Sequence, residues 1–211
     1  MSVEDGLVIT IPRWFNKNKI SEVLERKRNW IEKTSKKLEE LKPTTELPLE
    51  VSLKAIGRSY QVLYRPTTAK NVAVNEVGDE LIVCGRVSSK KLCRQELTKW
   101  VNKKAKEELI EITEEISSEI GISYNKLTIR NQKSRWGSCS SKKNISLNQK
   151  LLFLPSELAR YIIIHELCHI IHLNHSARFW NLVEKYVPNY RELNKISRKD
   201  SWRKHVPRWS L

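Results

Sequence analysis

The sequence predicts an α+β protein, and three observations carry this prediction. Short segments of alternating apolar residues, separated by turn residues, fill the first part of the chain. Runs with helical periodicity dominate from Ser88 onward. One of these runs contains the letters H-E-L-C-H at 165–169. We therefore expect two domains: residues 1–87, with a strand, a helix and a small β-sheet, and residues 88–211, with a long helix, a small antiparallel sheet and the H-E-x-x-H helix.

The first domain should begin with a strand and a charged helix. Residues 7–11 alternate like a strand, and residues 19–41 have the spacing of an amphipathic helix, which Pro43 would end. Turn residues such as Gly57 and Gly78 then punctuate the chain. The segments beside them predict short strands at 49–55, 59–65, 71–74 and 80–84. These strands would form a small, mostly antiparallel β-sheet.

The second domain should open with a long helix. Ser88 and Ser89 suit its start, apolar residues follow at core spacing to about Ile120, and Gly121 would end it. Short strands should come next, near residues 126–130, 136–140 and 144–148. A turn at 141–143 would join the last two strands, which favours a small antiparallel sheet.

The following helical run brings two histidines together. Ser156 would cap this helix, which we expect to end near residues 173–174. His165 and His169 are separated by about 40° of rotation and roughly 6 Å of rise, so both rings can reach one ion. Glu166 projects about 100° from His165, so its carboxylate can reach water on that ion without binding the ion. This is the arrangement of zinc-dependent hydrolases in which the glutamate is the general base.

A catalytic zinc also needs a third protein ligand. His175 can supply it if the chain turns back near residues 173–174, where an asparagine tolerates the left-handed conformation that ends helices. Glu184 is the alternative, since an acidic third ligand occurs in the other common zincin arrangement. His172 would lie about 10 Å along a straight helix from His165, too far to share the ion. We expect His172 to support the ligands or to be a partly buried helix residue.

Apolar residues surround the polar residues of this motif. Burying a carboxylate and imidazole rings without partners would cost free energy, and a bound metal ion would satisfy them. The same letters can also arise by chance on an amphipathic helix that binds nothing. Cys168 lies about 100° from His169, so we expect a small core residue there rather than a ligand.

The composition, with 39% hydrophobic and 30% charged residues, is ordinary for a globular protein. No segment approaches about 18 apolar residues, and the first residues do not look like a signal peptide, so we expect a cytoplasmic protein with no membrane partner. The four cysteines form no C-x-x-C pair, which suits reduced thiols. The net charge of +15 makes nucleic acid a possible partner. Between Lys126 and Lys150 the chain has seven basic residues and no acidic one, which favours a negatively charged substrate.

Several sequence blocks follow one another in an ordered set. They are R-N-Q-K-S-R-W-G-S-C at 130–139, N-I-S-L-N at 144–148, H-E-L-C-H at 165–169, N-H-S at 174–176, F-W at 179–180 and P-N-Y at 188–190. In these blocks, the chain resembles the YgjP-like family of metal-dependent hydrolases, which is related more distantly to SprT-type zinc proteases. The resemblance implies a zincin-like catalytic domain in which His165, His169 and His175 hold Zn²⁺ and Glu166 is the catalytic base.

The resemblance also implies a substrate-binding surface. By that resemblance Arg130, Arg135, Trp136 and Ser138 approach the metal cleft. An arginine can bind a carboxylate or a phosphate through two parallel hydrogen bonds, and a tryptophan could stack on a substrate group. Tyr190 could stabilise an oxyanion if the last helix folds over the cleft.

Two enzymatic functions and one non-enzymatic function remain open. A zinc metallopeptidase, which is our main prediction, would pair an extended peptide with residues 145–148. A nucleoside triphosphate pyrophosphatase would use the same metal residues, with the basic block binding the phosphates. A basic nucleic-acid-binding module with a structural metal would need a fourth protein ligand. The zincin motif favours the peptide substrate, whereas the acid-free basic block favours phosphate.

Overall fold

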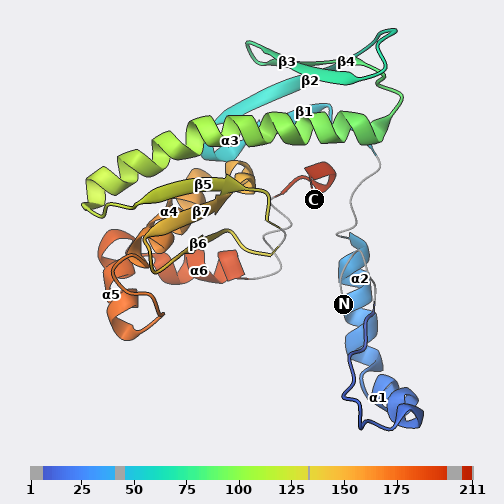
Figure 1. The fold of residues 1–211 in the computed structure, drawn as a ribbon, viewed down its shortest axis with the longest axis vertical. Coiled ribbons are helices and arrows are strands. Elements are labelled where there is room, and N and C mark those ends of the chain that lie inside the picture. The colour runs from blue at the N-terminus through green and yellow to red at the C-terminus, as the bar shows by residue number, and fades with distance from the viewer. Residues whose placement is uncertain (1–6, 41–45, 133, 199–205, 211) are drawn as a thin grey trace. The chain divides into compact units, whose positions relative to one another are not determined.

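The protein has a mixed α+β fold, as the sequence predicts. The computed structural model describes residues 7–40, 46–132, 134–198 and 206–210 (Figure 1). Contacts divide the chain into two compact units, residues 1–44 and residues 45–211. The predicted division between residues 1–87 and 88–211 falls inside the second unit, and as a domain boundary it stays a prediction.

The first unit is helical from Lys17 to Glu40, and the described residues before Lys17 form no helix or strand. A 3₁₀ turn, η1 (Lys17–Lys19), leads into α1 (Ile20–Arg26) and α2 (Arg28–Glu40). The single helix expected over 19–41 is therefore wrong: Lys27, with φ −103° and ψ 5°, interrupts it. Residue 41 lies outside the described residues.

The strand expected at 7–11 is also wrong, because these residues form no ladder. Their alternation is still meaningful. Leu7, Ile9 and Ile11 line a small apolar pocket together with residues of α1 and α2, whereas Val8 is 61% exposed. An alternating segment can place its apolar side against helices as well as within a sheet.

The second unit begins with a four-stranded sheet in the order β1-β2-β4-β3. Its strands are β1 (Glu50–Leu53), β2 (Arg58–Pro66), β3 (Val72–Val77) and β4 (Glu80–Gly85), and a short turn, η2 (Lys54–Ile56), joins the first two. β1 pairs with β2 and β3 with β4 in antiparallel fashion, which confirms the mostly antiparallel prediction. The β3–β4 hairpin folds back so that β4 runs parallel to β2.

The long helix α3 (Lys90–Ile120) runs along this sheet (Figure 1), while β1 and η2 also contact η3 (Gln149–Phe153) directly and η2 contacts α4 (Ser156–Cys168). It ends as predicted at Gly121, whose φ of 69° is the left-handed conformation that glycine adopts freely. A polar cluster ties α3 to the sheet: Glu76 accepts hydrogen bonds from Lys104 Nζ at 2.9 Å, Trp100 Nε1 at 3.0 Å and Tyr60 Oη at 3.1 Å. Burial alone would raise the pKa of Glu76, but these donors outweigh burial and lower it.

A second, three-stranded sheet packs on the other side of α3. It contains β5 (Lys126–Arg130), β6 (Gly137–Cys139) and β7 (Asn144–Asn148) in the order β5-β7-β6. β6 and β7 form the expected antiparallel hairpin, but β5 pairs parallel with β7 instead of antiparallel. The hairpin folds back so that β7 lies in the middle, which leaves β6 at an edge.

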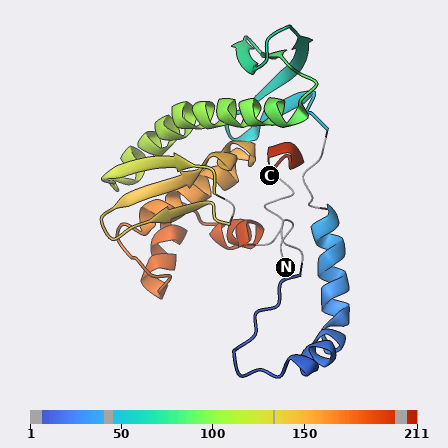
Figure 2. The same cartoon turned by 45° about the vertical axis from the view of Figure 1, so that its right-hand side comes forward.

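The remaining elements follow in the second half of this unit. They are η3 (Gln149–Phe153), α4 (Ser156–Cys168), α5 (Ala177–Tyr186), α6 (Tyr190–Arg198) and η4 (Arg208–Ser210). Figure 2, turned by 45°, shows the second sheet in front of α4, which contacts β6 and β7. None of the helices in the described ranges has the length and apolar character needed to cross a membrane.

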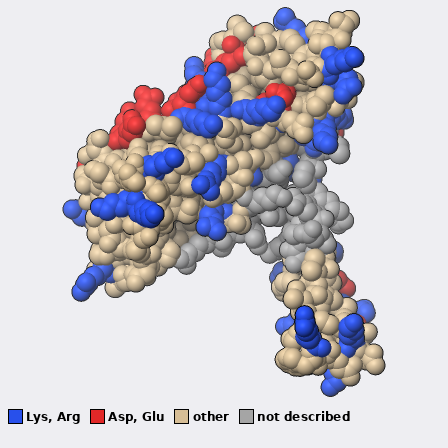
Figure 3. Space-filling model, viewed as in Figure 1, with Lys and Arg blue, Asp and Glu red and all other residues tan. Residues whose placement is uncertain are grey.

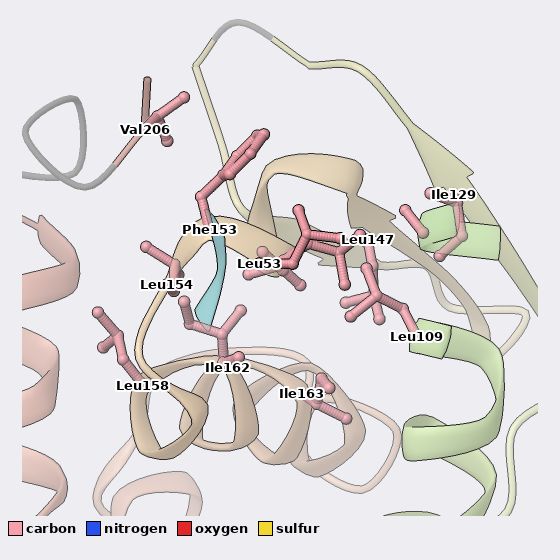
Figure 4. Packing of buried hydrophobic residues seen from close by; sticks show 14 of the residues in the cluster. Leu53, Leu109, Ile129, Leu147, Phe153, Leu154, Leu158, Ile162, Ile163 and Val206 are labelled. Carbon is pink, nitrogen blue, oxygen red and sulfur yellow. The ribbon is translucent and has the colours of Figure 1, made fainter. Parts of the chain in front are cut away.

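Helix α4 is held on its apolar side by the core. Figure 4 shows Leu158 and Ile162 of α4 near Leu154, and Ile163 on the side of α4 towards Leu109 of α3. These side chains are at most 4% exposed, and burying each one contributes about 1.5–3 kcal/mol. The core therefore fixes α4 as a rigid support for the residues at its C-terminal end.

Both ends of α4 differ from the prediction. Pro155, not Ser156, is the N-cap residue, because its φ of −51° and extended ψ of 142° end the preceding segment and Ser156 is already helical. The helix ends at Cys168, earlier than the expected 173–174. A tighter turn follows, in which the Ile170 amide donates to the Leu167 carbonyl at 3.0 Å.

Candidate metal centre and cleft

Three histidine side chains converge at the C-terminal end of α4. His165 lies in the last turn of α4, His169 is its cap residue, and the turn after the helix brings His175 back towards them. One ring nitrogen from each lies within 4.8 Å of the others. Nε2 of His165 and Nε2 of His175 are 3.1 Å apart. The structure thus brings together the three residues that the motif spacing selected.

This donor set fits a divalent metal ion such as zinc. Two nitrogen ligands on one tetrahedral zinc lie roughly 3.3 Å apart, close to the separation of the two Nε2 atoms. Nδ1 of His169 lies 3.0 Å from the His172 carbonyl oxygen, which can only accept a hydrogen bond. Nδ1 therefore carries the proton, and Nε2 keeps its lone pair for a ligand role. Burial lowers the pKa of His169 although this hydrogen bond raises it, which favours the neutral ring that metals require.

Aromatic side chains of helix α5 pack against the histidine rings. Phe179 stacks on His169 with centroids 4.4 Å apart, and Trp180 stacks on His175 at 5.4 Å. Tyr190, the first residue of α6, stacks in turn on Trp180 at 5.2 Å. Sequence reasoning assigned no role to the two aromatic residues of α5, although they follow His175 by four and five positions and thus fall in the next helical turn. They fix the ring of an otherwise exposed histidine.

Glu166 is the buried carboxyl group beside these rings. It is 7% exposed, and burial raises its pKa to about 7, against a lowering effect of Arg135. Strand β6 passes directly over this side chain at Gly137. A Cβ atom built at Gly137 would lie 2.6 Å from Cγ and 2.7 Å from Oε1 of Glu166. Only glycine leaves room for the carboxyl group there.

A cleft of about 420 Å³ connects these groups. β6 and the loop before it form one wall, α4 and the following turn carry the histidines and Glu166, and α6 adds polar groups. The lining residues are Arg135, Trp136, Gly137, Ser138, Cys139, Tyr161, Ile162, His165, Glu166, His169, Leu173, His175, Asn194 and Ser197.

The expected substrate-binding residues are therefore only partly brought together. Arg135, Trp136 and Ser138 line the cleft. Arg130 is exposed at the end of β5 and does not line it, and Tyr190 is 8% exposed and packs behind Trp180. The substrate-binding roles of all five residues stay predictions. The placement of Arg130 and Tyr190 does not favour such a role for these two residues.

Helix α6 contributes two cleft residues that the sequence did not reveal, Asn194 and Ser197. Their spacing of three places them on one face of a helix, but only the docking of α6 shows that this face meets the cleft. The docking uses two contacts at the start of α6. These are the Tyr190 stack and a hydrogen bond of 2.6 Å from Asn189 Nδ2 to Glu157 Oε1 at the start of α4.

The other residues considered near the motif lie elsewhere. Glu184 is exposed on α5 and forms an ion pair with Arg191 at 3.8 Å, outside the histidine cluster. The side chain of His172 is half-buried, and the residue contributes its carbonyl oxygen to His169. Cys168 is fully buried, and burial raises the pKa of its thiol to about 12, which confirms the expectation of a core residue.

The fold and this cleft are those of a metal-dependent hydrolase. The chain belongs to the YgjP-like, metallopeptidase domain family, whose model matches residues 1–199. Among solved structures, it is similar to the metallopeptidase zymogen abylysin of Pyrococcus abyssi, with 32% identity over 41% of this chain and 85% of that chain and a TM-score of 0.36. It is also similar to the metallopeptidase zymogen jannalysin of Methanocaldococcus jannaschii, with 30% identity over 42% of this chain and 91% of that chain and a TM-score of 0.37. No curated protein matches the chain.

Proposed function

We propose that the protein is a zinc-dependent metallopeptidase in which His165, His169 and His175 hold the ion and Glu166 is the general base. The observation that carries this proposal is the convergence of three ring nitrogens beside a buried carboxyl group whose pKa is near 7. Membership of a metallopeptidase family supports the peptide as substrate.

A zinc ion held there would act as a Lewis acid towards a peptide carbonyl and make a nearby water molecule a better nucleophile. Glu166 would take the proton from that water as it attacks the carbonyl carbon. The same carboxyl group would then deliver the proton to the nitrogen of the leaving amine. Burial raises the pKa of this carboxyl group above its usual value, which makes it a stronger base for the first transfer than an exposed glutamate would be.

The edge of β6 is the best candidate for aligning an extended peptide. Residues 145–148, the site expected from the sequence, belong to β7, which is paired on both sides, so that expectation is wrong. β6 pairs only with β7 among the described strands, and it borders the cleft directly above Glu166. A peptide adding to this edge would gain backbone hydrogen bonds and place a carbonyl beside the histidines.

Two alternative functions of the same site have less support. The position of Arg135 at the cleft is the observation that favours a nucleoside triphosphate pyrophosphatase, since a guanidinium also binds phosphate. A structural metal in a nucleic-acid-binding module would need a fourth ligand, and the cluster found in the described residues has three. The cytoplasmic location also stays a prediction from the sequence.

A substrate panel tests the proposed function. The zinc-loaded protein is incubated separately with an unfolded protein and with the common nucleoside triphosphates. We expect new peptide termini by mass spectrometry, lost on chelation and restored by zinc, and no pyrophosphate above the level without enzyme. Pyrophosphate release without peptide cleavage would overturn the proposal.

Metal binding provides a test of the ligand assignment. Replacing His175→Ala should weaken zinc affinity by about 100-fold, because it removes one of three converging nitrogens. The matched replacement His172→Ala should change the affinity less than about threefold, since the backbone carbonyl of residue 172 remains to orient His169. Both affinities are measured by competition with a chromogenic chelator. Equal losses in the two variants would contradict the assignment.

A further inference from the structure

Arg135 is a cationic group at the cleft, close enough to Glu166 to lower the pKa of that carboxyl group. Its side chain is exposed, lines the cleft, and forms no ion pair or hydrogen bond with any residue that the structure describes. Glu166 is the only carboxylate among the residues that line the described cleft, and it is almost fully buried. The guanidinium is therefore available to an incoming group.

The backbone that carries Arg135 is held in place by Asn148. This side chain is 1% exposed, and its Nδ2 donates to the carbonyl oxygens of Gln132 and Arg135, both at 2.9 Å. The Asn148 amide donates to the Trp136 carbonyl at 2.8 Å, and Oδ1 of Asn148 accepts from the Lys150 amide at 3.1 Å. Fixing the loop before binding lowers the entropy lost when a ligand pairs with the arginine.

Apart from Glu166, no carboxylate among the described cleft-lining residues offsets this charge. The segment 126–150, which contains the loop and the sheet strands β5 to β7, has no acidic residue. On the face seen in Figure 3, lysine and arginine side chains lie over the second sheet and no acidic side chain appears there. A divalent ion at the three histidines would add further positive charge to the cleft. The field in the cleft thus favours an anionic ligand.

We propose that Arg135 binds a carboxylate of the peptide substrate, so that the enzyme prefers acidic peptides. This inference rests on the proposed peptidase function. The planar guanidinium matches a carboxylate through two parallel hydrogen bonds, and a peptide offers that group either as an Asp or Glu side chain or as its C-terminal carboxylate.

Matched peptides test the preference and identify its source. One quenched fluorescent peptide is made with Glu, Gln or Lys at each position flanking the cleaved bond, and each version is made as a free acid and as a C-terminal amide. We expect kcat/KM to be about tenfold higher with Glu than with Gln at one position, mainly through KM. An advantage confined to the free acid would instead assign the C-terminal carboxylate as the bound group.

Charge reversal separates local binding from general electrostatics. Arg135→Glu should reverse the preference, so that the Lys peptide is cleaved better than the Glu peptide. Lys142→Glu changes the net charge equally, but Lys142 lies in the exposed turn between β6 and β7, away from the cleft lining, and should keep the Glu preference. Both replacements are at exposed positions, so folding is preserved.

The outcomes distinguish this inference from the proposed function. Cleavage of no peptide by the zinc-loaded protein would overturn the proposed function. Equal cleavage of Glu, Gln and Lys peptides by the wild type, as acid and as amide, would overturn the role of Arg135 alone. So would an equal shift of preference in the Arg135→Glu and Lys142→Glu variants, which would reduce the effect to long-range charge.

Discussion

Replacing Glu166→Gln is expected to lower kcat/KM for peptide cleavage by about 10³-fold while leaving zinc binding intact. Glutamine has nearly the shape of glutamate and fits beneath Gly137, but it cannot accept the proton of the attacking water. The three converging nitrogens belong to other residues, so the zinc content should stay near one ion per chain. The variant therefore separates proton transfer from metal binding.

The measurement combines turnover of an unfolded protein with elemental analysis of the purified variant. The wild type should also lose activity as the pH falls through the pKa of Glu166, because only the carboxylate form accepts a proton. That pKa is about 7 in the metal-free protein, and a cation at the histidines would lower it. Retained turnover in the glutamine variant, or loss of zinc together with activity, would remove Glu166 from the role of base.

Stability offers a second measurement on the same variant, independent of turnover. In the metal-free protein burial raises the pKa of Glu166 to about 7, so the folded state holds a proton that the unfolded state has lost. The free energy of unfolding should therefore fall as the pH rises from about 4.5 to about 7, by about 3 kcal/mol from this group. The glutamine variant lacks this titration and should be the more stable protein at pH 8 in urea unfolding.

The local parts of the fold were readable from the sequence because local rules determine them. The core-facing spacing from Leu97 to Ile116 and the glycine at 121 predict α3, and the structure places it at Lys90–Ile120. The strands at 126–130 and 144–148 agree with β5 and β7. The convergence of the histidines follows from helix geometry once the chain turns back, so their grouping was also predictable.

The parts that depend on distant contacts were not readable. Periodicity identifies β5 and β7 but does not show that they pair in parallel. Nor does it show that β7 is the central strand, whose two edges are both paired and cannot bind a peptide. The stacking of Trp180 on His175 and the arrival of α6 at the cleft depend on how α5 and α6 dock. A glycine such as Gly137 permits a close approach, but only the structure shows that the approaching group is Glu166.

This contact makes Gly137→Ala the second replacement with a large expected effect. The backbone at this position is not in the left-handed region, so alanine adds only a methyl group and no backbone strain. That methyl carbon would lie 2.6 to 2.8 Å from Cγ, Oε1 and Cδ of Glu166, so the buried carboxyl group must move. A displacement of about 1 Å can cost roughly 10²-fold in rate, and we expect a loss of that size in kcat. Zinc affinity should stay within about threefold of the wild type.

A double-mutant cycle locates the cause of this loss. The clash should also destabilise the fold by about 1–3 kcal/mol in the single variant, measured by urea unfolding at pH 5, where the carboxyl group is protonated. In the Glu166→Ala background the three atoms nearest to the methyl group are absent, so Gly137→Ala should then cost much less. The two replacements are in contact, and their effects on stability should therefore not add. An equal cost of Gly137→Ala in both backgrounds would mean that its methyl group meets something other than Glu166, and that β6 does not hold the carboxyl group in position.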